Sequence, residues 1–199
     1  TTSDLKGDNR ARYPKSGKFT MKGNPNAKAM ALLISHGVWA FLFAIWNDFF
    51  AFGPIYFYLG GIFAIVPAIR LDFSRGFLCA VVTGCFLDAA LPTPFGFHAC
   101  GLAIAQVVLR STNERTSIHR RQTLILTTLI MNLFLFLALH LWFSIQVPDG
   151  ADILHGRAFA DLVFSELLIA FTLPWLIKLH DDFLRITGIE PSGKPISAT

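Results

Sequence analysis

Long apolar runs, broken by short polar links, dominate this chain. The runs are continuous and do not alternate, which favours membrane-spanning helices over the strands of a barrel. A membrane-spanning helix needs ~20 residues, so the third and fourth runs are short and are expected to pair as a hairpin that returns the chain to the same side. The pattern predicts an all-α, polytopic membrane bundle of about six transmembrane helices. The runs are Ala29–Trp46, Phe49–Ile69, Gly76–Leu91, Phe95–Leu109, Thr123–Val147 and Ala158–Ile177.

The amino-acid composition also indicates that this chain lies in a lipid bilayer. Hydrophobic residues make up 53% of the 199 residues and charged residues only 15%, and phenylalanine alone contributes 20. Soluble domains average ~45–50% apolar and ~25% charged residues. A soluble fold of this size could not cover so much apolar surface, whereas a bilayer solvates it.

The distribution of positive charge predicts the orientation. The tail 1–28 and the links 70–75, 110–122 and 178–199 hold 16 of the 17 Lys and Arg residues, and the opposite side holds only Arg157. That opposite side instead has Asp48, Asp149 and Asp152. Because positively charged segments stay in the cytoplasm, both termini are expected there.

Three regions follow from these patterns. Residues 1–28 are basic and poor in large apolar side chains, which predicts a disordered cytoplasmic tail that touches anionic lipid rather than nucleic acid. Residues 29–179 form the transmembrane domain, and 180–199 form a cytoplasmic C-terminal tail. Asp181 and Asp182 are expected to lie at a solvated end.

A stripe of small residues marks the third run. Gly76, Ala80, Gly84 and Asp88 recur every four residues and therefore share one helix face. Small residues let helices approach closely in lipid. The fourth run offers a matching face in Gly101 and Ala105, and a Pro- and Gly-containing turn lies between the two runs. The stripe predicts either a tight hairpin or an interface with a partner helix.

Polar and ionisable residues also occur inside the apolar runs, where they are costly and usually face the protein interior. The topology places several of them in the outer third of the membrane, on four helices, with Glu166 nearer the middle and His36 in the inner half. This outer layer is a packing network, a small outward-facing ligand pocket, or a proton or metal site. The outer residues are Asp88, His98, His140 and Asp161.

Enzymatic chemistry has little support in the sequence. There is no HExxH zinc motif, no GxSxG nucleophile motif and no Gly-rich phosphate loop. Cys79, Cys85 and Cys100 lie in apolar runs without metal-ligand spacing, which is typical of small buried hydrophobes. We therefore expect no catalytic residue, metal or cofactor.

Residues 54–109 resemble the core of the MreD family of bacterial rod-shape-determining membrane proteins. In that family a helix ending in Gly…Leu-Asp is followed by a short turn and then by Pro-x-Gly-x-His-Ala. The matching residues here are Gly84, Leu87-Asp88, Pro92 and Pro94-Phe95-Gly96-Phe97-His98-Ala99. The layout of about six helices with little outside the bilayer is also similar.

The resemblance implies a non-enzymatic scaffold in the bacterial cytoplasmic membrane. It implies partnership with an MreC-like protein and, through it, with the actin-like MreB, the glycosyltransferase RodA and a penicillin-binding transpeptidase. The family's fold is similar to the substrate-binding subunits of energy-coupling-factor vitamin transporters, so such a subunit is the alternative hypothesis. A third is an accessory subunit of a respiratory or photosynthetic complex, in which His36 or His140 could bind haem or chlorophyll.

Overall fold

The fold is all-helical over the part of the chain that the structure describes, residues 25–49, 55–115, 121–146 and 151–186 of a computed structural model. The predicted fold class is confirmed. The proposed disordered tail lies outside the described residues up to residue 24. The six helices are α1 (Pro25–Phe49), α2 (Gly60–Arg70), α3 (Phe73–Ala90), α4 (Phe97–Arg115), α5 (Arg121–Gln146) and α6 (Ala151–Ile186).

Four of the described helices are long and apolar enough to cross a membrane: α1, α3, α5 and most of α6. Their outward faces leave large apolar side chains uncovered, such as Phe41 on α1, Phe134 on α5 and Phe171 on α6. Such faces would be unstable in water but are solvated by lipid tails. The chain is therefore a membrane protein.

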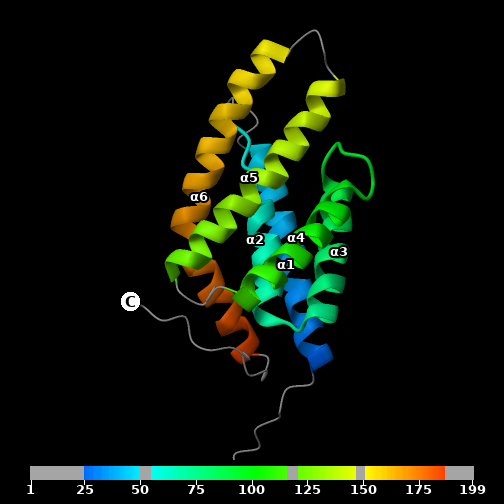
Figure 1. The fold of residues 1–199 in the computed structure, drawn as a ribbon, viewed down its shortest axis with the longest axis vertical. Coiled ribbons are helices and arrows are strands. Elements are labelled where there is room, and N and C mark those ends of the chain that lie inside the picture. The colour runs from blue at the N-terminus through cyan, green and yellow to red at the C-terminus, as the bar shows by residue number, and fades with distance from the viewer. Residues whose placement is uncertain (1–24, 50–54, 116–120, 147–150, 187–199) are drawn as a thin grey trace, which may run out of the picture.

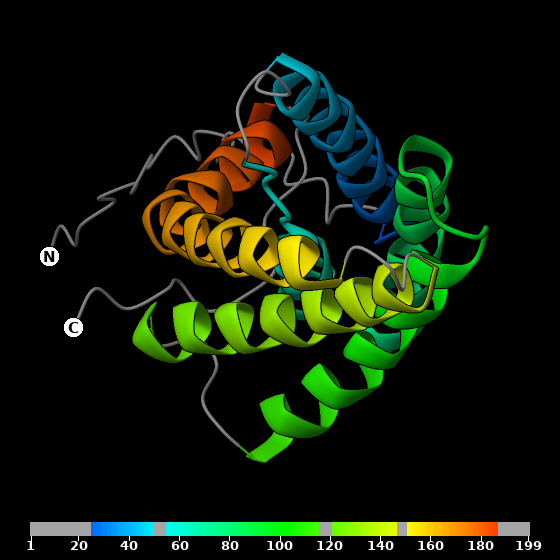
Figure 2. The same cartoon turned by 90° about the horizontal axis from the view of Figure 1, so that it is seen from above.

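Successive helices run in opposite directions between two ends of the bundle, so α1, α3 and α5 point one way and α2, α4 and α6 the other (Figure 1). We call the end where α1 begins and α6 finishes the tail end. The opposite end, where α3 turns into α4 and α5 approaches α6, is the hairpin end. The α3–α4 pair and the α5–α6 pair lie on different sides of the bundle when it is seen from above (Figure 2).

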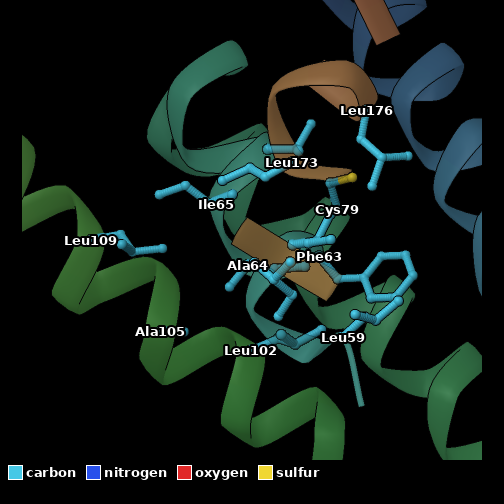
Figure 3. Packing of buried hydrophobic residues seen from close by; sticks show 14 of the residues in the cluster. Leu59, Phe63, Ala64, Ile65, Cys79, Leu102, Ala105, Leu109, Leu173 and Leu176 are labelled. Atoms are coloured by element: carbon cyan, nitrogen blue, oxygen red, sulfur yellow. The ribbon is translucent and has the colours of Figure 1, made fainter. Parts of the chain in front are cut away.

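The short helix α2 lies in the centre of the bundle. Its residues from Gly60 to Pro67 are all buried, and it packs against α3, α4, α5 and α6. A helix that is apolar all round belongs inside a protein, and here the other helices surround it. The core cluster joins Phe63, Ala64 and Ile65 of α2 to Leu102 of α4 and Leu173 of α6 (Figure 3).

The second apolar run differs from the prediction. Phe49–Ile69 was expected to be one helix, but the structure is helical only from Gly60, and residues 55–59 belong to no helix. The described part of the run is therefore a non-helical segment followed by a short helix.

The last helix is longer than predicted. The apolar run ended at Ile177 and a tail was expected from residue 180, but α6 continues to Ile186. The extra turns are held by tertiary contacts, since His180 and Leu184 are buried and Asp181 is ion-paired. At the other terminus α1 begins at Pro25, a residue well suited to the first helical turn, rather than at Ala29.

Candidate functional site

The non-helical segment 55–59 and the start of α2 are held by polar side chains from three other helices. Inside a membrane every backbone donor needs a partner within the protein. Four backbone N–H groups here each donate to a side-chain oxygen. We call the four acceptors the collar; they are Asn47 for Phe57 (2.9 Å), Asp161 for Tyr56 (2.7 Å), Ser165 for Tyr58 (2.8 Å) and Asn132 for Gly61 (3.0 Å).

The collar explains why this apolar stretch is not a helix. Asn47 also donates from Nδ2 to the carbonyl of Phe57 at 2.9 Å, so one side chain pairs with both backbone groups of that residue. In many membrane proteins the break in a discontinuous helix leaves backbone groups without helical partners, and these groups bind a substrate. Here these groups are already paired within the chain, so this segment is a structural element rather than an open binding site.

Asn47→Ala is expected to lower the free energy of unfolding by about 1–2 kcal/mol, because it removes two hydrogen bonds to a backbone that lacks helical partners. Denaturation in mild detergent with increasing SDS measures the change. Asp48→Ala is the matched control: this neighbouring side chain is exposed, and its removal should stay within about 0.5 kcal/mol. Equal losses in both variants would contradict the role of the collar.

Asp88 joins α3 to the first turn of α4. Its carboxylate accepts hydrogen bonds from the backbone N–H groups of Gly96 (2.8 Å), His98 (2.8 Å) and Ala99 (3.3 Å). The ring of His98 donates from Nδ1 to the same carboxylate at 2.8 Å. A carboxylate at a helix N-terminus satisfies donors that the helix itself cannot pair and interacts favourably with its dipole. We call this arrangement the Asp88 clamp.

The turn before α4 is shaped to reach the clamp. Gly96 has φ +100°, a left-handed conformation that favours glycine, and this orients its N–H toward Asp88. Pro92 lies exposed in the same turn, and Thr93 Oγ1 is 3.4 Å from Asp88 Oδ1. The Leu-Asp…Pro-x-Gly-x-His pattern therefore contains the parts of one structural unit.

The small-residue stripe of α3 faces other helices of the same chain. A Cβ on Gly84 would lie 2.4 Å from the backbone of Ala99, so α3 and α4 are in direct backbone contact there. A Cβ on Gly76 would meet the Pro67 carbonyl of α2 at 3.2 Å, and Ala80 between them is fully buried. On α4, Ala105 is buried in the core and Gly101 approaches Leu135 of α5.

The polar residues expected inside the membrane, both those of the outer layer and the deeper Glu166 and His36, have separate hydrogen-bond partners and form no single network among the described residues. Asp88 binds His98, as described. His140 Nε2 and His155 Nδ1 lie 2.8 Å apart, so one ring donates to the other between α5 and α6. Glu166 accepts a hydrogen bond from Asn132, the collar residue of α5, at 3.1 Å. Asp161 belongs to the collar, and His36 lies next to Thr83 and the ring of His180.

A buried charge cluster at the tail end was not expected from the sequence. Arg70, the last residue of α2, donates to Asp181 of α6 at 2.6 Å, and Lys28 of α1 is also buried. The solvated end expected for Asp181 was therefore wrong, because the cation that pairs with it is 111 residues away in sequence. The one signal in the sequence for this buried ion pair was that Arg70 directly follows the apolar run Phe49–Ile69.

Asp181→Asn is expected to lower the free energy of unfolding by about 2 kcal/mol, because Arg70 then keeps its charge in a buried position without a counter-ion. The same SDS titration measures the change, and Asp182→Asn is the neighbouring control. The double variant Arg70→Met/Asp181→Leu should recover most of the loss, since it leaves no buried charge. A double variant as unstable as the single one would contradict this explanation.

The turn between α2 and α3 has its own ion pair outside the membrane-spanning segments. Arg75 donates to Asp72 Oδ1 at 2.6 Å and to Asn26 of α1 at 2.9 Å. The hydrogen bond from Arg75 lowers the pKa of the Asp72 carboxyl below its ordinary value. This contact links the first turns of α1 and α3 at the tail end.

Two hollows are large enough to consider as binding sites. One, of about 260 Å³, lies at the hairpin end between α5, α6 and the turn 91–93, and includes Asp161 and His140. The other, of about 660 Å³, is an apolar groove between α1 and α6 lined by Trp39, Trp46 and Trp175. Among the described residues no group of three or more His, Cys, Asp or Glu side chains could hold a metal ion.

A buried short helix, its polar collar and the surrounding long apolar helices define a polytopic α-helical membrane protein. Comparison with protein-family models, curated proteins and solved structures finds no match to this chain. The resemblance to the MreD family therefore rests on the residues quoted above, and what it implies about function is a proposal.

Proposed function

We propose that this chain is a non-enzymatic scaffold subunit of the bacterial cell-elongation machinery, embedded in the cytoplasmic membrane with both termini in the cytoplasm. Its partner in that role is an MreC-like protein with other subunits of the peptidoglycan-synthesising complex. The proposal follows from the resemblance of residues 54–109 to the MreD family and from the structural role of those residues in the α3–α4 hairpin.

The Asp88 clamp is the observation that supports a scaffold best. Three backbone N–H groups and the His98 ring converge on this carboxylate, and the Asp88 side chain is completely buried. Such a carboxylate has its hydrogen-bonding capacity taken up and is closed to substrate. The motif that supports the resemblance is thus used to build a rigid helical hairpin.

The collar also favours a scaffold over a vitamin-binding subunit. The backbone donors of the discontinuous segment are paired within the chain. The apolar groove of about 660 Å³ lies within the ~300–1,000 Å³ typical of sites for drug-sized ligands, whereas the hollow at the hairpin end, of about 260 Å³, is smaller. Its charged lining is nevertheless the observation that keeps the transporter subunit as the second candidate.

Purification with partners tests the proposed function. The tagged full chain is extracted in mild detergent from membranes of its own cell, and the co-purified proteins and small molecules are identified by mass spectrometry. We expect an MreC-like protein and peptidoglycan-synthesis subunits, without a stoichiometric small molecule. A coupling ATPase with a bound vitamin-like compound would instead establish a transporter subunit, and respiratory or photosynthetic subunits would establish the third hypothesis.

A further inference from the structure

The hollow at the hairpin end combines apolar walls with one carboxylate that has free hydrogen-bonding capacity. Side chains from α5, α6 and the turn 91–93 supply most of its wall. Six of the lining residues are apolar: Leu91, Pro92, Phe136, Leu139, Phe143 and Ala158. Asp161 is the acidic member of the lining, and it is only 7% exposed.

Only one oxygen of Asp161 is engaged by a hydrogen bond among the described residues. Oδ1 accepts from the backbone N–H of Tyr56 at 2.7 Å. For Oδ2 the nearest cation in the described part of the chain is Arg157 Nε at 3.8 Å, which is too long for a hydrogen bond. A carboxylate oxygen that faces an apolar hollow and makes no hydrogen bond within the described residues favours a ligand that brings a charged donor.

The other polar side chains of the hollow are differently placed. His140 is hydrogen-bonded to His155, and Thr93 is close to the Asp88 clamp. The Arg157 side chain is 53% exposed, so it lies at the rim and can turn toward solvent. Tyr56 also lines the hollow, with a neutral phenol. Asp161 is therefore the acidic group that a cationic ligand entering the hollow would meet in its wall.

We propose that this hollow binds an aliphatic ammonium group, with the nitrogen on Asp161 Oδ2 and the carbon stem against the apolar walls. Lysine-like groups bury an apolar stem in this way while their charge stays paired, and the rings of Phe136 and Phe143 are suitable neighbours for a cation. The volume suits one such group, from a small amine or from a lysine side chain of a partner protein. The site does not depend on which complex the chain joins.

The geometry also assigns Arg157 a role as competitor. Its guanidinium is the cation that the ammonium group must replace near Oδ2. Loss of Arg157 should therefore strengthen binding, whereas loss of the Asp161 charge should weaken it. A site for anions would show the opposite response to Arg157.

Binding to the purified full chain in nanodiscs tests the proposal by ligand-observed NMR titration. The probes are n-butylammonium, the peptide acetyl-Ala-Lys-Ala-amide and its norleucine counterpart. Asp161→Asn keeps the acceptor for Tyr56 and should weaken butylammonium binding about tenfold. Arg157→Gln should tighten it about threefold. Asp48→Asn removes an exposed charge outside the hollow and should stay within about twofold of the unmodified chain.

The peptides distinguish the two sources of the ammonium group. Tighter binding of the lysine peptide than of butylammonium indicates a partner's side chain, and equal or weaker binding indicates a small amine. Norleucine binding equal to that of lysine would overturn the proposal. So would unchanged binding by Asp161→Asn, or weaker binding by Arg157→Gln, in variants whose thermal unfolding matches that of the unmodified chain.

Discussion

Asp88→Asn is expected to lower the free energy of unfolding by about 4 kcal/mol, the largest loss from an isosteric change in this protein. An asparagine keeps one acceptor oxygen but places an NH₂ group where the carboxylate receives backbone donors. The N–H groups of Gly96 and Ala99 both point to Oδ2, so at least one helix-end donor stays buried without a partner. SDS titration from mild detergent measures the loss.

Two controls separate the Asp88 clamp from a general charge effect. Asp72→Asn removes a carboxylate that is largely exposed and should cost under about 1 kcal/mol. His98→Asn removes the ring that donates to Oδ1 but leaves all three backbone donors paired, and should cost less than Asp88→Asn. An Asp88→Asn variant as stable as the Asp72→Asn variant would mean that the clamp does not hold the hairpin.

Gly84→Leu is expected to destabilise the bundle by about 4 kcal/mol and to separate α3 from α4. A Cβ at this position would lie 2.4 Å from both Cα and N of Ala99 and 2.7 Å from the carbonyl carbon of His98. These are backbone atoms, so they cannot rotate away as a side chain would. The variant should still insert into membranes, since its apolar character increases.

Gly37 is the matched control for Gly84. It also lies inside a long helix, α1, but a Cβ there would meet nothing within 4 Å. Gly37→Ala should therefore stabilise the protein slightly, by up to about 1 kcal/mol, because alanine loses less backbone entropy in a helix. Gly84→Ala should have the opposite sign. Equal effects at the two positions would refute close backbone contact at Gly84.

The Gly84→Leu variant also tests the proposed function, through its effect on co-purification of the partner protein. If the α3–α4 hairpin is a rigid part of a scaffold, Gly84→Leu should lose the co-purified MreC-like protein while staying in the membrane fraction. Retention of the partner by an unfolded hairpin would show that the scaffold binds through other helices.

The long apolar runs were sufficient to predict the helices that face lipid. For α1, α3 and α5 the predicted ends lie within four residues of the observed ones, because length and continuous apolar character identify spanning helices directly. The spacing of Gly76, Ala80 and Gly84 also identified a close-packing face. It could not tell whether the face meets this chain or a partner, and the structure places it against α2 and α4.

The central segment needed the tertiary structure. Hydropathy cannot distinguish a non-helical apolar stretch from a helical one, because both have the same apolar side chains and differ in where their backbone hydrogen bonds go. For residues 55–59 those partners are side chains on α1 and α6, up to 107 residues away in sequence. No local pattern reports such contacts.

The amino-acid sequence by itself determined that this is an all-helical membrane protein, and which faces of its helices contain small or polar residues. Only the tertiary structure decided what those residues do: Asp88 holds α4, Asp181 pairs with Arg70, and Asp161 accepts from the backbone N–H of Tyr56 with one oxygen while the other faces Arg157. The physical reason is that transfer from water to lipid depends on each segment's own composition, whereas a hydrogen bond depends on a partner that only folding brings into reach.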